Sequence, residues 1–103
     1  MINELIVIIS NKKIMNPPLT RSKGRVLFNG HYETWYSQKK LPGKGLKIPG
    51  RHVGGGLVRD GENFICVATT LVGMGQQIET SLGPGKRYDT CNTPNTVDIY
   101  TDW

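Results

Sequence analysis

The chain has 103 residues, which is enough for one domain with a small hydrophobic core and too few for two. Thirteen glycines and six prolines, with no apolar residues at helical spacing over three turns, predict an all-β fold of short strands and many turns. The net charge of +5 is uneven, because residues 1–58 carry ten basic and two acidic residues and residues 59–103 carry three basic and six acidic residues. The basic half favours an anionic polymer as partner, or it only keeps the domain soluble.

The N-terminal region contains the longest apolar run, Leu5 to Ile9. This run is far shorter than the ~20 residues of a membrane-spanning helix, so we expect no membrane partner. It also lacks the basic start and the small-residue cleavage site of a signal peptide. We interpret residues 1–24 as a flexible leader and a proline-rich basic linker, followed by one compact domain over residues 25–103.

The first predicted strands are Arg25–Phe28 and His31–Ser37, joined by the favoured hairpin turn Asn29-Gly30. In the second strand, Thr34 and Tyr36 share one face, and Trp35 lies on the other. Aromatic residues at this density are typical of a core, and they also suit a groove in which an aromatic face stacks on a sugar. The pattern favours the core for two of the three aromatic residues of this strand.

A long loop follows, from Gln38 to Gly56, and it combines many glycines with basic side chains. It lacks the pattern of a phosphate-binding loop. Loops of this length in compact domains are usually functional or mobile, so we expect it to flank the site and carry positive charge. Its basic residues are Lys39, Lys40, Lys44, Lys47 and Arg51.

The second half of the chain contains four more predicted strands, which bring the total after the linker to six. The first of them follows a turn at Asp60-Gly61 and is apolar throughout, as in a strand buried on both faces. Six short strands at this spacing predict a small barrel. The four strands are Phe64–Thr70, Gln76–Ser81, Lys86–Cys91 and Val97–Thr101.

The last two strands carry Asp89 and Asp98, with turn-forming residues between them. We expect the two carboxylates to meet across a hairpin-like connection. Paired carboxylates raise the pKa of one member, which keeps a proton available near neutral pH. The alternative is that each aspartate only stabilises a turn or lies solvated on an edge strand.

The two cysteines, Cys66 and Cys91, are a candidate disulfide that would close a loop of about 25 residues and contribute about 3 kcal/mol. Such a pair would favour an extracellular location. Because Cys66 lies in an apolar run, a buried free thiol is the alternative. The cysteines and the two histidines, His31 and His52, lack the spacing of paired metal ligands, so we expect no metal and no other cofactor.

Four segments in chain order, ETWYSQ, FICVATT, GMGQQIETSLGPGKRYDTC and NTVDIYTDW, resemble the three-aspartate (3D) domain of bacterial cell-wall proteins, a relative of the lytic transglycosylase and rare-lipoprotein-A barrels. The resemblance covers about 70 of the 103 residues and implies a six-stranded double-psi β-barrel. It departs from the family at Ala68-Thr69-Thr70, where the first aspartate is missing unless Asp60 or Asp102 replaces it, and at Cys91-Asn92, which replaces a Gly-Gly pair.

The resemblance implies a monomer, outside the cell or in the cell wall, that acts on peptidoglycan glycan strands. The implied reaction is lytic transglycosylase cleavage, with Asp98 as acid/base and Asp89 as the residue that tunes it. The missing aspartate favours the alternative of a non-catalytic module that binds the wall. Nucleic acid is disfavoured as a partner, because the acidic residues cluster in one half. The implied substrate contacts are Thr34, Trp35, Tyr36, Lys39, Lys40, Lys44, Tyr100 and Asp102.

Overall fold

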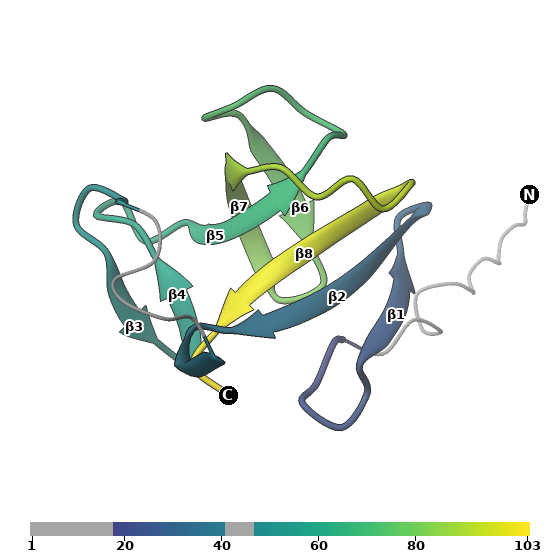
Figure 1. Ribbon diagram of the computed structural model, residues 1–103, viewed down its shortest axis with the longest axis horizontal. Coiled ribbons are helices and arrows are strands. Elements are labelled where there is room, and N and C mark those ends of the chain that lie inside the picture. The colour runs from purple at the N-terminus through teal and green to yellow at the C-terminus, as the bar shows by residue number, and fades with distance from the viewer. Residues whose placement is uncertain (1–17, 41–46) are drawn as a thin grey trace, which may run out of the picture.

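The computed structural model describes residues 18–40 and 47–103, which form a curled half-barrel sheet (Figure 1). The described residues contain no α-helix, which confirms the all-β prediction, and η2, a 3-10 turn, covers Gln38–Lys40. They form eight strands instead of six, since two short strands, β3 and β4, were not predicted. The strands are β1 (Arg25–Phe28), β2 (His31–Ser37), β3 (His52–Gly54), β4 (Leu57–Arg59), β5 (Ile65–Thr69), β6 (Gln77–Thr80), β7 (Gly83–Asp89) and β8 (Thr96–Thr101).

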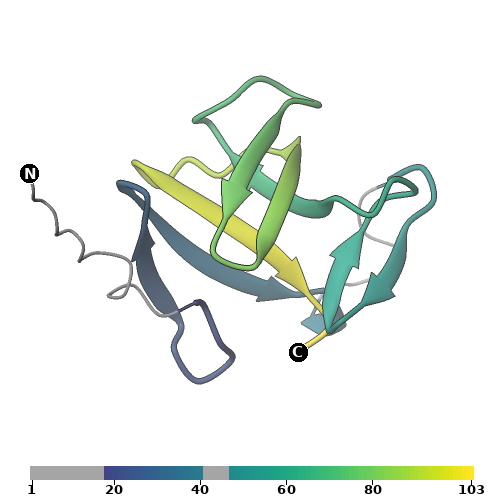
Figure 2. The same ribbon diagram turned by 180° about the vertical axis from the view of Figure 1, so that it is seen from behind.

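The sheet has the strand order β1-β2-β8-β4-β5-β7-β6, with β3 beside β4 and a further pairing between β8 and β5. Two pairs are parallel, β2 with β8 and β5 with β7, and the others are antiparallel. Seen from behind, the β6–β7 hairpin stands across β8 (Figure 2). The expected hairpin between the last two strands is wrong, because β5 lies between β7 and β8.

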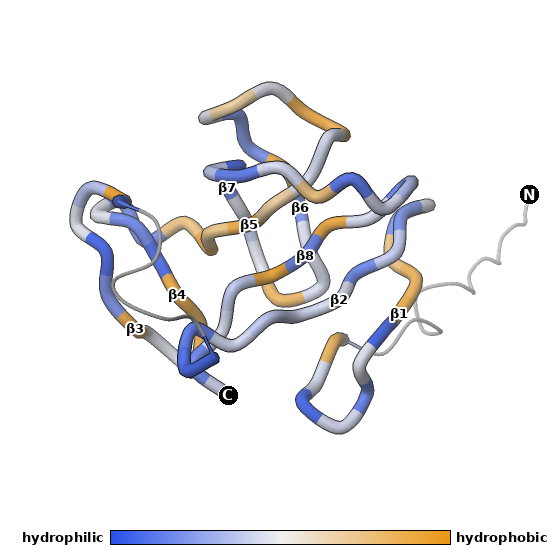
Figure 3. Tube along the Cα trace, in the orientation of Figure 1, coloured by the Kyte–Doolittle hydropathy of each residue, from blue (hydrophilic) through white to orange (hydrophobic). Residues whose placement is uncertain are grey.

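Apolar side chains fill both faces of β5. All five residues of this strand are buried, as its apolar sequence predicts, and much of the strand is orange in Figure 3. The larger cluster includes Ile65 and Val67, and the smaller one includes Cys66, which points to the other face because side chains alternate along a strand. Leu19 of the predicted linker is only 1% exposed and belongs to the larger cluster, so this part of the linker is anchored to the core.

Two turns were expected from the sequence, and both are present. Asn29 and Gly30 join β1 to β2 with φ values of 48° and 83°, the positive pair that a two-residue hairpin turn needs. The turn after β4 is longer than expected, because the Asp60 N–H bonds to the carbonyl oxygen of Phe64 at 3.0 Å. Its positive φ of 71° belongs to Asn63.

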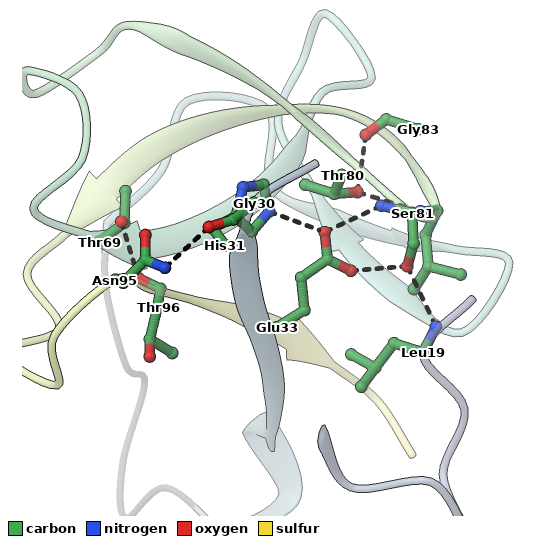
Figure 4. Close-up of polar contacts among 11 residues, drawn as sticks. Leu19, Gly30, His31, Glu33, Thr69, Thr80, Ser81, Gly83, Asn95 and Thr96 are labelled. Carbon is green, nitrogen blue, oxygen red and sulfur yellow. Dashed lines mark hydrogen bonds and ion pairs between the residues drawn. The ribbon is translucent and has the colours of Figure 1, made fainter. Parts of the chain in front are cut away.

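A buried carboxylate connects distant parts of the sheet. Glu33 of β2 is fully buried, and its carboxylate accepts bonds from the Ser81 hydroxyl at 2.6 Å and the Ser81 N–H at 2.9 Å (Figure 4). Nε2 of His31 lies 3.1 Å from the same carboxylate, and the Leu19 N–H donates to the Ser81 hydroxyl at 3.0 Å. Because a buried polar group is costly without hydrogen-bond partners, this network holds β2, the β6–β7 turn and Leu19 together.

We expect Glu33→Gln to lower the free energy of unfolding by about 2–4 kcal/mol, because the amide nitrogen cannot accept a bond and leaves a buried donor unpaired. Urea denaturation measures the change. Glu79→Gln is the matched control, because Glu79 is exposed on β6, and it should change stability by less than about 0.5 kcal/mol. Equal stability of the two variants would contradict the role of Glu33.

Candidate functional site

Four residues from four neighbouring strands form a row across one face of the sheet. Ala68 of β5 is in register with Asp89 of β7 on one side and with Asp98 of β8 on the other. Asp98 is also in register with Thr34 of β2. Because register partners point to the same face, both carboxylates face the same side, with their Cα atoms two strand spacings, roughly 10 Å, apart. Only the methyl group of Ala68 lies between them in the row.

Asp98 is half-buried and is oriented by one hydrogen bond. The Thr34 hydroxyl donates to its Oδ1 at 2.7 Å. Burial raises the pKa of Asp98, and the bond from Thr34 opposes this rise only in part. Asp98 therefore keeps its proton to a higher pH than an ordinary aspartate, and the cause is burial, whereas the sequence suggested tuning by Asp89.

Asp89 is bonded through both carboxylate oxygens. The Tyr100 hydroxyl donates to Oδ2 at 2.9 Å, and the Thr90 N–H donates to Oδ1 at 2.8 Å. Burial, and then the bond to Asp89, raises the pKa of Tyr100, so its hydroxyl remains a donor. Arg87 supports this turn, because its guanidinium bonds the main-chain oxygen of Asp89 at 3.0 Å and the Thr90 hydroxyl at 2.7 Å. Asp89 thus both stabilises a turn and positions Tyr100.

The two aromatic residues predicted to line the groove lie on different faces. Tyr36 is 37% exposed and is in register with Tyr100, on the face of the aspartates. Trp35 points to the opposite face, where it packs against the larger core cluster and contacts Trp103 edge to face, with ring centroids 5.3 Å apart. Trp35 thus contributes to the core side of the sheet and is separated from Tyr36 and the aspartates.

Three of the remaining predicted substrate contacts, Lys39, Lys40 and Asp102, lie beyond the ends of β2 and β8. Lys39 and Lys40 are exposed in η2, and Lys44 lies outside the described residues. Asp102 accepts a bond from Nε2 of Gln38 at 3.0 Å. This end of the sheet supplies exposed positive charge, and the Asp102 carboxylate is bonded there instead of joining the row.

No third carboxylate joins the row within the described part of the chain. Thr69, near the position where the resembled domain has its first aspartate, is fully buried and donates to the Thr96 carbonyl oxygen at 2.8 Å. Asp60 is 2% exposed and lies in the turn after β4, where it accepts bonds from the Tyr88 hydroxyl at 2.7 Å and the Phe64 N–H at 2.9 Å. Asp60 therefore forms a separate polar cluster with Tyr88, away from the row.

Tyr88 was missed by the sequence analysis. The register between β5 and β7 shifts between Val67 and Ala68, which makes a β-bulge in β7. The bulge lets Tyr88 pack against the smaller core cluster while Asp89 keeps its place in the row. Bulges re-aim side chains in this way, and neither neighbour of Tyr88, Arg87 or Asp89, is a glycine that would mark this one.

The cysteines are both free thiols, so the candidate disulfide between Cys66 and Cys91 is not formed in the structure. Cys66 is buried, and burial raises its pKa to about 12, so it stays a protonated thiol. Residues 18–40 and 47–103 hold no group of three or more histidine, cysteine or acidic side chains placed to bind a metal. No helix in these ranges has the length and hydrophobicity to span a membrane.

Comparisons of the chain with protein-family models, curated proteins and solved structures give no match. The functional assignment therefore depends on the geometry of the row and on the motifs that carry the resemblance. The structure brings five of the predicted site residues to one face of the sheet. They are Thr34, Tyr36, Asp89, Asp98 and Tyr100.

We expect Thr34→Val to raise the pKa of Asp98 further, because the hydroxyl bond that favours the charged carboxylate is lost while the carboxyl stays buried. Carboxyl carbon chemical shifts, followed by NMR across a pH titration, report this pKa. Thr34→Ser is the control that keeps the hydroxyl and the wild-type titration. An unchanged pKa in the valine variant would show that Thr34 does not control the charge of Asp98.

Proposed function

We propose that this chain is a double-psi β-barrel domain of the three-aspartate type that cleaves peptidoglycan glycan strands with a single acid/base, Asp98. The two parallel strand pairs, joined through the antiparallel β5–β8 pairing, support the barrel assignment. The sequence motifs supply the family and the substrate class. The proposed location is outside the cell or in the cell wall, where the glycan strands are.

The observation that carries the proposal is the state of Asp98. A general acid needs a proton near the working pH, and burial raises the pKa of this carboxyl in that direction. The Thr34 hydroxyl fixes its orientation at 2.7 Å. Tyr36 and Tyr100 lie beside it on the same face, and they offer aromatic surface for a sugar ring.

The chemistry needs one carboxyl group and no attacking water. Protonated Asp98 donates its proton to the glycosidic oxygen as the bond from that oxygen to the sugar C1 breaks. The carboxylate left on Asp98 then accepts the proton of the same sugar's C6 hydroxyl, whose oxygen bonds to C1 and closes a 1,6-anhydro ring. Hydrolysis, in contrast, requires two carboxyl groups at a set separation. Asp89 acts indirectly in this scheme, by positioning the Tyr100 hydroxyl.

One observation favours a second function, that of a binding module without catalysis. Both oxygens of Asp89 are occupied by hydrogen bonds, and the row contains two carboxylates where the family pattern has three. Such a module would hold glycan strands on the same aromatic face. It would co-sediment with purified peptidoglycan sacculi and release no soluble fragments.

We expect Asp98→Asn to abolish the release of soluble fragments from sacculi, measured by chromatography. The amide oxygen can still accept the bond from Thr34, so stability should stay within about 1 kcal/mol of wild type. The sign of the remaining difference depends on pH. Since burial disfavours charged Asp98, the stability of wild type relative to the variant should fall as pH rises from below the ordinary aspartate pKa of about 3.9 towards neutrality.

Glu79→Gln, on exposed β6, is the matched control and should release fragments at the wild-type rate. Wild-type turnover in Asp98→Asn would remove the proposed role of Asp98. Co-sedimentation of the wild-type protein without any release would instead support the binding module.

A further inference from the structure

A pocket of about 380 Å³ opens next to the row, between the turn that follows β4 and the middle of β7. Its position follows from the sheet register: Lys86 of β7 pairs with Cys66, two residues before Ala68 on β5. The pocket therefore starts roughly 7 Å along the sheet from the aspartate row. Its lining residues are Pro49, Gly50, Asp60, Gly61, Glu62, Lys86 and Tyr88.

One wall of the pocket is backbone and proline ring. The Gly61 N–H donates to the carbonyl oxygen of Pro49 at 2.8 Å, which brings the two chain segments together. Gly50 has a positive φ of 69°, and a Cβ atom there would collide with the backbone of Gly61. The close approach requires glycine, and it leaves a flat surface without side chains at these two positions.

The polar side of the pocket combines a cation with carboxylates. Nζ of Lys86 donates to Oε1 of Glu62 at 2.8 Å, lies 3.7 Å from Oδ2 of Asp60 and sits 4.7 Å from the ring centre of Phe64. The bond to Glu62 raises the pKa of Lys86, so the amine stays charged. The Glu62 side chain is 72% exposed, which leaves its second oxygen open to a ligand.

Asp60 is the buried carboxylate that contacts both Lys86 and Tyr88 in this pocket. Burial raises the pKa of Asp60, but bonds from the Tyr88 hydroxyl and two backbone N–H groups outweigh it and leave the pKa below its usual value. Asp60 therefore stays charged beside Lys86. Because the Tyr88 hydroxyl donates its hydrogen bond to Asp60, the hydroxyl oxygen of Tyr88 can accept a hydrogen bond from a ligand. The lining of the pocket thus includes one donor, Lys86, and two acceptors, Glu62 and Tyr88.

We propose that this pocket binds one ring of a glycan through neighbouring hydroxyl groups. Each sugar hydroxyl both donates and accepts, which matches a pocket that combines a donor, Lys86, with the acceptors Glu62 and Tyr88. Two carboxylates against one ammonium disfavour an anionic ligand, and the flat wall of Pro49 and the glycines suits the apolar face of a pyranose. The volume lies within the range of small-ligand sites. The identity of the glycan rests on the proposed function.

The test uses the tetramer of N-acetylglucosamine as the probe and the full chain carrying Asp98→Asn, which cannot cleave it in the proposed scheme. In ¹⁵N-labelled protein, the Gly50 and Gly61 amide signals should shift on titration. Adding Glu62→Ala should weaken binding about tenfold, which corresponds to about 1.4 kcal/mol for a lost bond to a charged group. Glu79→Ala is the matched control and should bind as the parent does.

Absence of shifts at Gly50 and Gly61, or undiminished binding by the Glu62→Ala variant, would overturn the proposal. Tighter binding of 1,5-diaminopentane than of the tetrasaccharide would also overturn it, because the pocket would then be a cation site. The two proposals fail separately. If the wild-type protein cleaves glycan strands but the Gly50 and Gly61 signals do not shift, only the pocket proposal is rejected. If the pocket binds the tetrasaccharide but the wild-type protein cleaves nothing, only the catalytic function is rejected.

Discussion

The fold depends on the buried carboxylate of Glu33. A carboxyl group with no exposure to water is tolerated only when its oxygens are bonded, and here Ser81 supplies two donors from the β6–β7 turn. In the strand order, β1 and β6 are the two edges of the sheet, and strand pairing alone would leave them far apart. The bonds from Ser81 hold the two ends together, and Leu19 joins them through the same hydroxyl group. The curl of the half-barrel is therefore fixed by side chains as well as by strand pairing.

On the side of the sheet that carries the smaller apolar cluster, two polar centres are built on the same scheme. In each, a tyrosine hydroxyl donates to a carboxylate, Tyr100 to Asp89 and Tyr88 to Asp60, and both tyrosines pack on the smaller apolar cluster. Asp98 differs because its one side-chain donor is Thr34, and the cost of burial outweighs that bond. This difference is the physical basis for proposing Asp98 as the acid.

Local patterns predicted part of this arrangement. The Asn29-Gly30 turn and the strands on either side of it follow from neighbouring residues, and so does the burial of β5 on both faces. The alternation along β2 already separated Trp35 from Tyr36, and the structure keeps them apart. The insertion of β5 between β7 and β8 was not predictable, because it joins segments distant in sequence. The bulge at Tyr88 has no local signal, so the Asp60 pocket was missed with it.

The proposed reaction is an intramolecular cleavage without water on this face of the sheet. The most direct measurement is mass spectrometry of the products that the wild-type protein releases from purified peptidoglycan glycan strands. The account predicts fragments that end in a 1,6-anhydro sugar and carry no added water. Fragments with a free reducing end, or strands that remain intact, would contradict it.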